Sequence, residues 1–166
     1  MNTKRLIRVL ALSIFLLFGL NSVFATAHAK KSLVIKGNVG SEVEVSLEQI
    51  KRLDQVVIDT NTPWTQGMVR FQGPLLKDVL ALAQPKGDWL MLRALDQYQA
   101  SASYSKIIDY QPIVAWKMDG KEMSVRKRGP YWIMFPIDEY EELKAHIFND
   151  YMVWQLYEIE VMTKEP

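Results

Sequence analysis

The chain has 166 residues, carries 20 Lys and Arg against 19 Asp and Glu, and contains no cysteine and two histidines. Without cysteine it has no disulfide, no thiolate nucleophile and no thiolate metal ligand. His146 is the one histidine beyond the first 29 residues, so multi-histidine zinc sites and Ser-His-Asp triads are disfavoured.

The N-terminal segment predicts a signal peptide over residues 1–29 and a domain over residues 30–166. A basic start is followed by an apolar run over residues 9–20 and then by small residues suited to cleavage. The run is shorter than the roughly 20 residues of a membrane span, with an uncleaved anchor as the alternative. We therefore expect a periplasmic protein that does not span the membrane after cleavage.

Cleavage also changes the charge of the protein. Removing the three basic residues of the signal peptide leaves 17 basic against 19 acidic residues in the domain. A slightly acidic domain is a poor nucleic-acid binder, because neutralised phosphates supply most of that affinity. We expect no nucleic-acid partner.

Strand signals recur along the domain. Alternating or continuous apolar residues predict strands over residues 33–37, 43–45, 56–58, 89–95, 98–103, 113–118, 121–125, 131–135 and 154–161. Asp119 and Gly120 lie between two of these strands and predict a tight hairpin.

The central stretch, residues 60–80, predicts the end of a strand, an irregular turn, a short strand and then a helix. Pro74 fits the first helical position, because its missing N–H would have no partner there. Ahead of that helix, several polar groups and Trp64 crowd into a loop, where binding groups tend to lie. A core plug behind a turn is the alternative for Trp64.

The other helix signals are short. Ser46 and Gln49 form a capping-box pattern that predicts a helix to about Leu53. Periodicity predicts helical turns over residues 104–110 and a polar helix over residues 137–146. The expected fold class is α+β, a single mainly-β domain with short helices.

Three pieces of the sequence stand in an order that resembles a known family. They are residues 60–65 with 70–80, residues 119–123 with 128–132, and residues 153–156. They contain the patterns F-x-G-x-x-L-x-D-x-L and M-D-G-K…G-P, which are fairly specific in combination. Together they resemble the molybdopterin-binding domain of the sulfite oxidase fold, in its short exported form. The resemblance covers most of residues 33–162 and implies that fold.

One departure from the family pattern bears on function. In the enzymes of this family a cysteine about four residues before the tryptophan ligates molybdenum, and counting back from Trp64 places Thr60 there. A threonine hydroxyl is a far poorer ligand for such a centre. The chain is therefore similar to cysteine-less relatives that act as periplasmic pterin-binding receptors. The resemblance implies a partner, the periplasmic domain of a membrane-bound signalling protein that makes or degrades cyclic-di-GMP, or of a kinase.

The resemblance also implies the residues of a pterin site. A flat pterin needs an aromatic plane and a few aligned donors and acceptors. Trp64 and Trp132 are the stacking candidates, because the family brings their two loop-to-strand junctions together. Asp96 is expected to accept two N–H bonds from the guanidine-like edge of the pterin, with a turn aspartate as the alternative.

The remaining candidates surround the tryptophans. Arg128 is expected to face a phosphate or a hydroxylated tail, although a solvated loop is the competing interpretation for residues 126–128. Thr60 and Thr65 complete the predicted cofactor-binding set. The other three tryptophans of the domain are assigned to the core, because Trp89, Trp116 and Trp154 each lie in an alternating strand. His146 is assigned to the solvated surface.

The leading functional hypothesis is a non-enzymatic periplasmic sensor. It binds a pterin, either a reduced monapterin or neopterin type or molybdopterin itself, without molybdenum, and regulates a membrane-bound partner. The alternative is a molybdenum-cofactor oxidoreductase with a metal ligand other than cysteine. An interaction module with a vestigial pocket is the third hypothesis.

Overall fold

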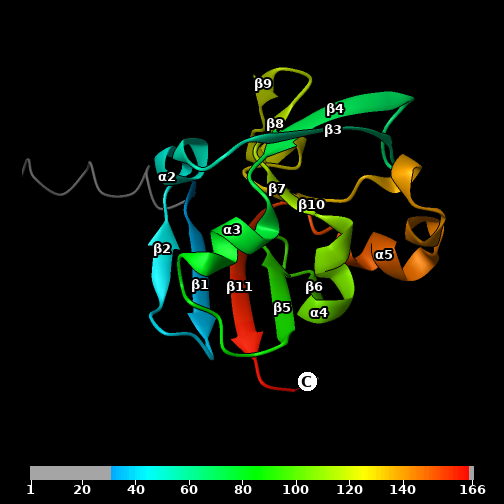
Figure 1. The fold of residues 1–166 in the computed structure, drawn as a ribbon. Helices are drawn as coiled ribbons and strands as arrows, with labels where there is room; N and C mark the ends of the chain where they lie inside the picture. The colour runs from blue at the N-terminus through cyan, green and yellow to red at the C-terminus, as the bar shows by residue number, and fades with distance from the viewer. Residues whose placement is uncertain (1–30, 165–166) are drawn as a thin grey trace, which may run out of the picture. The chain divides into compact units, whose positions relative to one another are not determined.

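A five-stranded sheet forms the base of the part of the chain that the computed structural model describes, residues 31–164 (Figure 1). Its strand order is β2-β1-β11-β5-β6, with β1 and β11 parallel and the other pairs antiparallel. The five strands are β1 (Leu33–Gly37), β2 (Val43–Val45), β5 (Trp89–Ala94), β6 (Gln99–Ser103) and β11 (Leu156–Met162).

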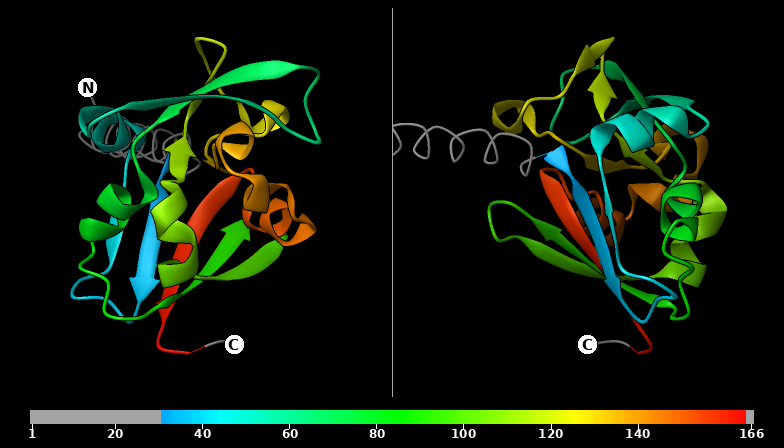
Figure 2. Two further views of the ribbon diagram at one scale, coloured as in Figure 1. Left: turned by 45° about the vertical axis from the view of Figure 1, so that its right-hand side comes forward. Right: turned by 90° about the vertical axis from the view of Figure 1, so that its left-hand side faces the viewer.

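The two faces of this sheet differ in polarity, as the alternation of the sequence predicts. One face is apolar and buried, and helices α3 and α4 lie on that side (Figure 2). The other face carries ion pairs, in which Arg93 contacts Glu158 at 2.6 Å and Glu160 at 2.7 Å. Lys36 lies 3.0 Å from Glu158 on the same face. The core therefore lies on the helix side of the sheet.

A four-stranded antiparallel sheet and a two-stranded one complete the β structure. The first has the order β3-β4-β8-β9 and the second pairs β10 with β7. Their strands are β3 (Val56–Asn61), β4 (Met68–Gly73), β7 (Ile113–Ala115), β8 (Lys117–Met118), β9 (Lys121–Glu122) and β10 (Trp132–Met134). The hairpin predicted between β8 and β9 is confirmed, with φ of 47° at Asp119 and 76° at Gly120.

The helices are short, as predicted. The α-helices are α2 (Leu47–Arg52), α3 (Leu76–Ala81), α4 (Tyr104–Ile107) and α5 (His146–Tyr151). The 3-10 helices are η2 (Ile108–Tyr110), η3 (Val125–Lys127), η4 (Ile137–Glu139) and η5 (Glu141–Lys144). The capping box of α2 is confirmed, since Ser46 and Gln49 bond to each other's backbone. The fold class predicted from the sequence is confirmed.

Two helix predictions are wrong in detail. Helix α3 begins at Leu76 instead of Pro74, because the Pro74 carbonyl accepts from the N–H of Val114 in strand β7. The polar helix expected over residues 137–146 is instead two 3-10 turns followed by α5. Extended backbone at Tyr140 separates the turns, and its ring packs against Tyr110 at 5.2 Å between centroids. Tertiary packing overrides the local propensity here.

Residues 1–29 lie outside the described residues, so the signal peptide stays a prediction. Within residues 31–164, no helix has the length and apolarity that crossing a membrane requires.

Gly73 lies where strand β4 of the four-stranded sheet approaches strand β7 of the two-stranded sheet. A Cβ added at Gly73 would lie 2.0 Å from the carbonyl oxygen of Val114 and 2.8 Å from the Cα of Ala115. Both of these atoms are backbone, so they cannot move aside as a flexible side chain would. The close approach of β4 to β7 therefore requires glycine at this position.

We predict that Gly73→Ala lowers the free energy of unfolding by about 3 kcal/mol, because the methyl group forces the strands apart. Gly67→Ala is the control. Its Cβ meets no atom within 4 Å, and its φ of 67° makes the expected cost about 1 kcal/mol. Urea unfolding of both variants measures the difference, and equal stability of the two would contradict this account of Gly73.

Candidate functional site

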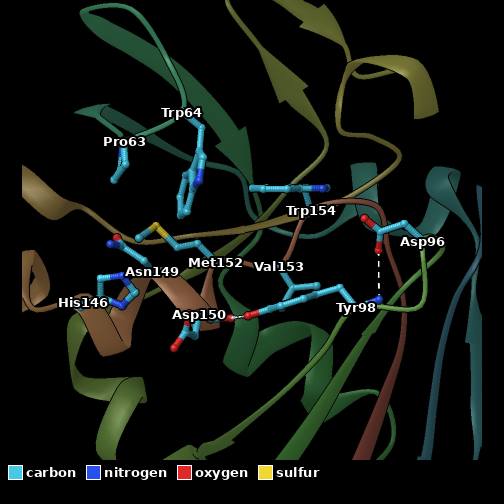
Figure 3. Close-up of a pocket in the computed structure, with 10 residues that line it drawn as sticks. All are labelled: Pro63, Trp64, Asp96, Tyr98, His146, Asn149, Asp150, Met152, Val153 and Trp154. Atoms are coloured by element: carbon cyan, nitrogen blue, oxygen red, sulfur yellow. Dashed lines mark hydrogen bonds between the residues drawn. The ribbon is translucent and has the colours of Figure 1, made fainter.

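A pocket of about 380 Å³ lies between the β3–β4 loop, the β5–β6 turn and the segment that joins α5 to β11 (Figure 3). Trp64 comes from the first of these segments, Asp96 and Tyr98 from the second, and Trp154 from the third. The volume lies within the range of small-molecule sites. The pocket is therefore large enough for a ring-sized ligand.

Two tryptophans form one wall. The rings of Trp64 and Trp154 meet edge to face, with centroids 5.4 Å apart and planes at 80°. Both side chains are partly exposed and line the pocket. Because the two planes are nearly perpendicular, a flat ligand can stack on the face of only one of these rings at a time.

Trp132 lies behind this wall instead of lining it. It is fully buried, with its ring centroid 6.1 Å from that of Trp64 and 5.9 Å from that of Trp154. Its Nε1–H donates to the carbonyl of Met152 at 2.9 Å, and Phe71 packs on its other side at 5.4 Å. The structure thus brings the two predicted stacking residues together, with Trp64 in the pocket and Trp132 as its support.

Trp154 is the aromatic that sequence reasoning missed. The alternation of residues 154–161 placed it in the last strand, but β11 begins at Leu156. Gln155 between them has φ of 51°, which turns the chain just before the strand and leaves Trp154 in the pocket wall. A tryptophan two residues ahead of a strand gives no sequence signal that distinguishes these positions.

Polar groups lie opposite the tryptophans. An oxygen of Asp96 accepts from the N–H of Tyr98 at 3.0 Å, while its other oxygen points toward Trp154 (Figure 3). Asp96 is therefore both the predicted turn aspartate and a pocket residue. The Tyr98 hydroxyl donates to the carbonyl of Asp150 at 3.2 Å. Burial, with a contribution from Asp150, raises the pKa of Tyr98, so its hydroxyl remains protonated at neutral pH.

Helix α5 supplies the rest of the polar side. His146, Asn149 and Asp150 line the pocket from this helix, and His146 is exposed, as expected of it. No other described side chain bonds to the carboxylate of Asp150. The pocket thus holds two carboxylates, and within residues 31–164 no Lys or Arg lines it.

Arg128 lies beside the pocket, over the tryptophans. Its guanidinium carbon is 5.3 Å from the centroid of Trp132 and 5.5 Å from that of Trp154. These are cation–π distances. Arg128 therefore braces the aromatic cluster and is not among the residues that line the pocket.

The two predicted threonines hold the loop that carries Trp64. The buried Thr60 hydroxyl accepts from the backbone N–H of Asp138 at 3.3 Å, and it lies 3.4 Å from an oxygen of the Asp138 carboxylate. The Thr65 hydroxyl bonds to that of Thr62 at 2.9 Å, and Thr62 also accepts from the N–H of Trp64. Neither Thr60 nor Thr65 lines the pocket.

Comparison with known proteins identifies the family. Residues 22–138 match the family model described as the oxidoreductase molybdopterin binding domain. The chain belongs to this family. No curated protein sequence matches it significantly.

A solved structure supports the same fold. The crystal structure of the sulfane dehydrogenase SoxCD from Paracoccus pantotrophus is similar to this chain, with a TM-score of 0.62 and 18% sequence identity. The match covers 81% of this chain but only 38% of that one. The predicted family and sulfite oxidase fold are therefore confirmed, and the chain corresponds to a part of the larger protein.

The Asp138 contacts predict a pH dependence of stability. The N–H of Asn61 donates to this carboxylate at 2.8 Å and its side-chain amide at 2.9 Å. The backbone bond from Asn61 is the main cause that lowers the pKa of Asp138. The ionised carboxylate therefore stabilises the folded state at pH values above its unfolded-state pKa of about 4.

We predict that Asp138→Asn lowers the free energy of unfolding by a constant amount between pH 5 and 7. The difference from wild type shrinks as the pH falls below about 4 and the wild-type carboxylate becomes protonated. Urea unfolding at a series of pH values measures it. A difference that stays the same down to pH 2.5 would contradict this role of the charge.

Proposed function

We propose that this domain binds a metal-free pterin and acts as a periplasmic sensor that regulates a membrane-bound signalling partner. One observation supports the pterin most directly. A tryptophan face and a carboxylate, Trp64 with Trp154 and Asp96, line the same pocket. The location rests on the predicted signal peptide, and the partner on the resemblance to cysteine-less receptors.

The pocket chemistry suits a pterin ring. The ring is flat and heteroaromatic, so it stacks on a tryptophan face with a gain of about 1–3 kcal/mol, as nucleic-acid bases do. Its amino-pyrimidinone edge carries two neighbouring N–H donors, which a carboxylate such as Asp96 can accept together. The Tyr98 hydroxyl, which donates to the carbonyl of Asp150, offers its oxygen as an acceptor at the polar edge opposite the aromatic wall.

The same residues fit a molybdenum cofactor poorly. The hydroxyl of Thr60, at the position of the metal-binding cysteine, is buried and engaged by Asp138. Two carboxylates in the pocket also repel the phosphate that molybdopterin carries. These features weigh against the metal-bearing form of the cofactor.

The alternative is a molybdenum-cofactor oxidoreductase with a ligand other than cysteine. Membership of a molybdopterin-binding family favours it. It requires a protein ligand other than cysteine, and Thr60, at the position where the resemblance implies that cysteine, is buried and bonded to Asp138, so the sensor is the better-supported proposal.

Regulation requires that ligand binding alter a surface of the domain that the partner can contact. Trp64 contacts Trp132 and Trp154 and sits on the loop that joins β3 to β4. A ligand stacked on Trp64 therefore contacts the loop at the end of the β3–β4 hairpin (Figure 1). We propose that the signalling partner reads pocket occupancy through this loop.

We predict that the purified domain binds reduced neopterin or monapterin. Asp96→Asn should weaken binding about ten- to a hundredfold, because it replaces a charged acceptor of two N–H groups with an amide. Trp64→Ala should weaken it about tenfold through lost stacking. Isothermal titration calorimetry under anaerobic conditions measures both.

Asp109→Asn is the matched control, since Asp109 is exposed and lies outside the pocket. Its affinity should equal that of wild type. The proposal fails if the wild-type domain binds neither pterin, or if both pocket variants bind as tightly as the control.

A further inference from the structure

A second, smaller pocket adjoins the first. It has a volume of about 290 Å³ and shares two wall residues with the larger pocket, Pro63 and Asn149. Its other walls come from the end of β3 and from η4 and η5, and they include Asn61, Asp138 and Lys144. Two pockets with a common boundary can hold two parts of one ligand.

The shared boundary lies at a defined end of the larger pocket. Figure 3 shows Asp96 at one side and Pro63 and Asn149 at the other, with Trp64 and Trp154 between them. A pterin whose amino-pyrimidinone edge meets Asp96 directs its opposite end toward Pro63 and Asn149. That end of the ring carries the side chain, so the side chain points into the second pocket.

Asn149 is suited to recognise a hydroxylated side chain. Its amide bonds to no other described side chain or backbone group, and the residue is half-buried. A primary amide offers both a donor and an acceptor, which match the hydroxyl groups of a short polyol. Because helix α5 carries it, its position is fixed relative to the aromatic wall.

The charges around the boundary favour an uncharged side chain. Asp138 holds its negative charge, because hydrogen bonds from Asn61 lower its pKa. The cation of Lys144 is paired with Glu141 at 2.5 Å. Asp150 lines the larger pocket only, so Asp138 is the carboxylate among the described residues that line the second pocket. A phosphorylated side chain would meet this negative group and a cation that is already paired.

We propose that the second pocket holds the uncharged, hydroxylated side chain of the ligand and that Asn149 determines specificity for it. This inference rests on the proposed pterin binding and adds to it the place of the side chain and the residue that selects it. Asn149 lines both pockets, while Trp64, Trp154 and Asp96 line the larger one alone, so a probe without the side chain tests ring binding separately.

The experiment compares three reduced probes by calorimetry: 6-methylpterin, neopterin and neopterin phosphate. The wild-type domain should bind neopterin about three- to tenfold more tightly than 6-methylpterin, as expected for one or two hydrogen bonds. Neopterin phosphate should bind more weakly than neopterin. Asn149→Ala should abolish the preference for neopterin, because it removes the contacts to the side chain and so weakens neopterin binding more than 6-methylpterin binding.

Two further variants make the result specific. Asn149→Asp keeps the acceptor, loses the donors and adds a negative charge. It should therefore weaken the binding of neopterin and weaken the binding of neopterin phosphate even more. Asn38→Ala is the matched control, since Asn38 bonds to Thr163 and lines neither pocket. Its preference should equal that of wild type.

The outcomes separate the two proposals. If 6-methylpterin and neopterin bind equally to wild type, or if Asn149→Ala weakens both alike, the side-chain site is refuted while pterin binding stands. Tighter binding of neopterin phosphate than of neopterin refutes the uncharged class. If no probe binds, the proposed function and the side-chain site are both refuted.

Discussion

The packing of three tryptophans is the interaction on which the candidate site depends. Trp132 is buried between Phe71 on one side and Trp64 and Trp154 on the other. These residues come from four separate segments of the chain, so their contacts fix the β3–β4 loop against the segment before β11. Arg128 covers the cluster by cation–π contact. The pocket wall thus packs directly against the hydrophobic core, which holds the two rings in place.

Thr60 occupies the position at which the resemblance to the sulfite oxidase family implies a metal-ligating cysteine. Its hydroxyl accepts a hydrogen bond from the N–H of Asp138 in η4, and this contact helps to anchor the end of β3. The contact is structural, while the aromatic wall nearby lines an open pocket. Ring binding without metal chemistry is therefore the function that we propose for this site.

Sequence reasoning predicted most strands and the family, but it placed the site residues only in part. Alternation and the Asp119-Gly120 turn are local signals, so the strands and the β8–β9 hairpin followed from them. The 3-10 turns around Tyr140 and the position of Trp154 depend on contacts between distant segments, which no local pattern encodes. For the same reason the second pocket could not be predicted from sequence. Asn149 and Pro63 line the same two pockets only because the fold brings α5 and the β3–β4 loop to opposite walls of a common space.

The most direct test of the central claim is the analysis of protein isolated from the cells that naturally produce it. Acid releases any bound pterin from the protein, and the released pterin is oxidised and identified by fluorescence and mass spectrometry. The molybdenum content of the protein is measured by plasma mass spectrometry. The account predicts a pterin without phosphate in near-stoichiometric amount and molybdenum at trace level. Stoichiometric molybdenum accompanied by molybdopterin would contradict it.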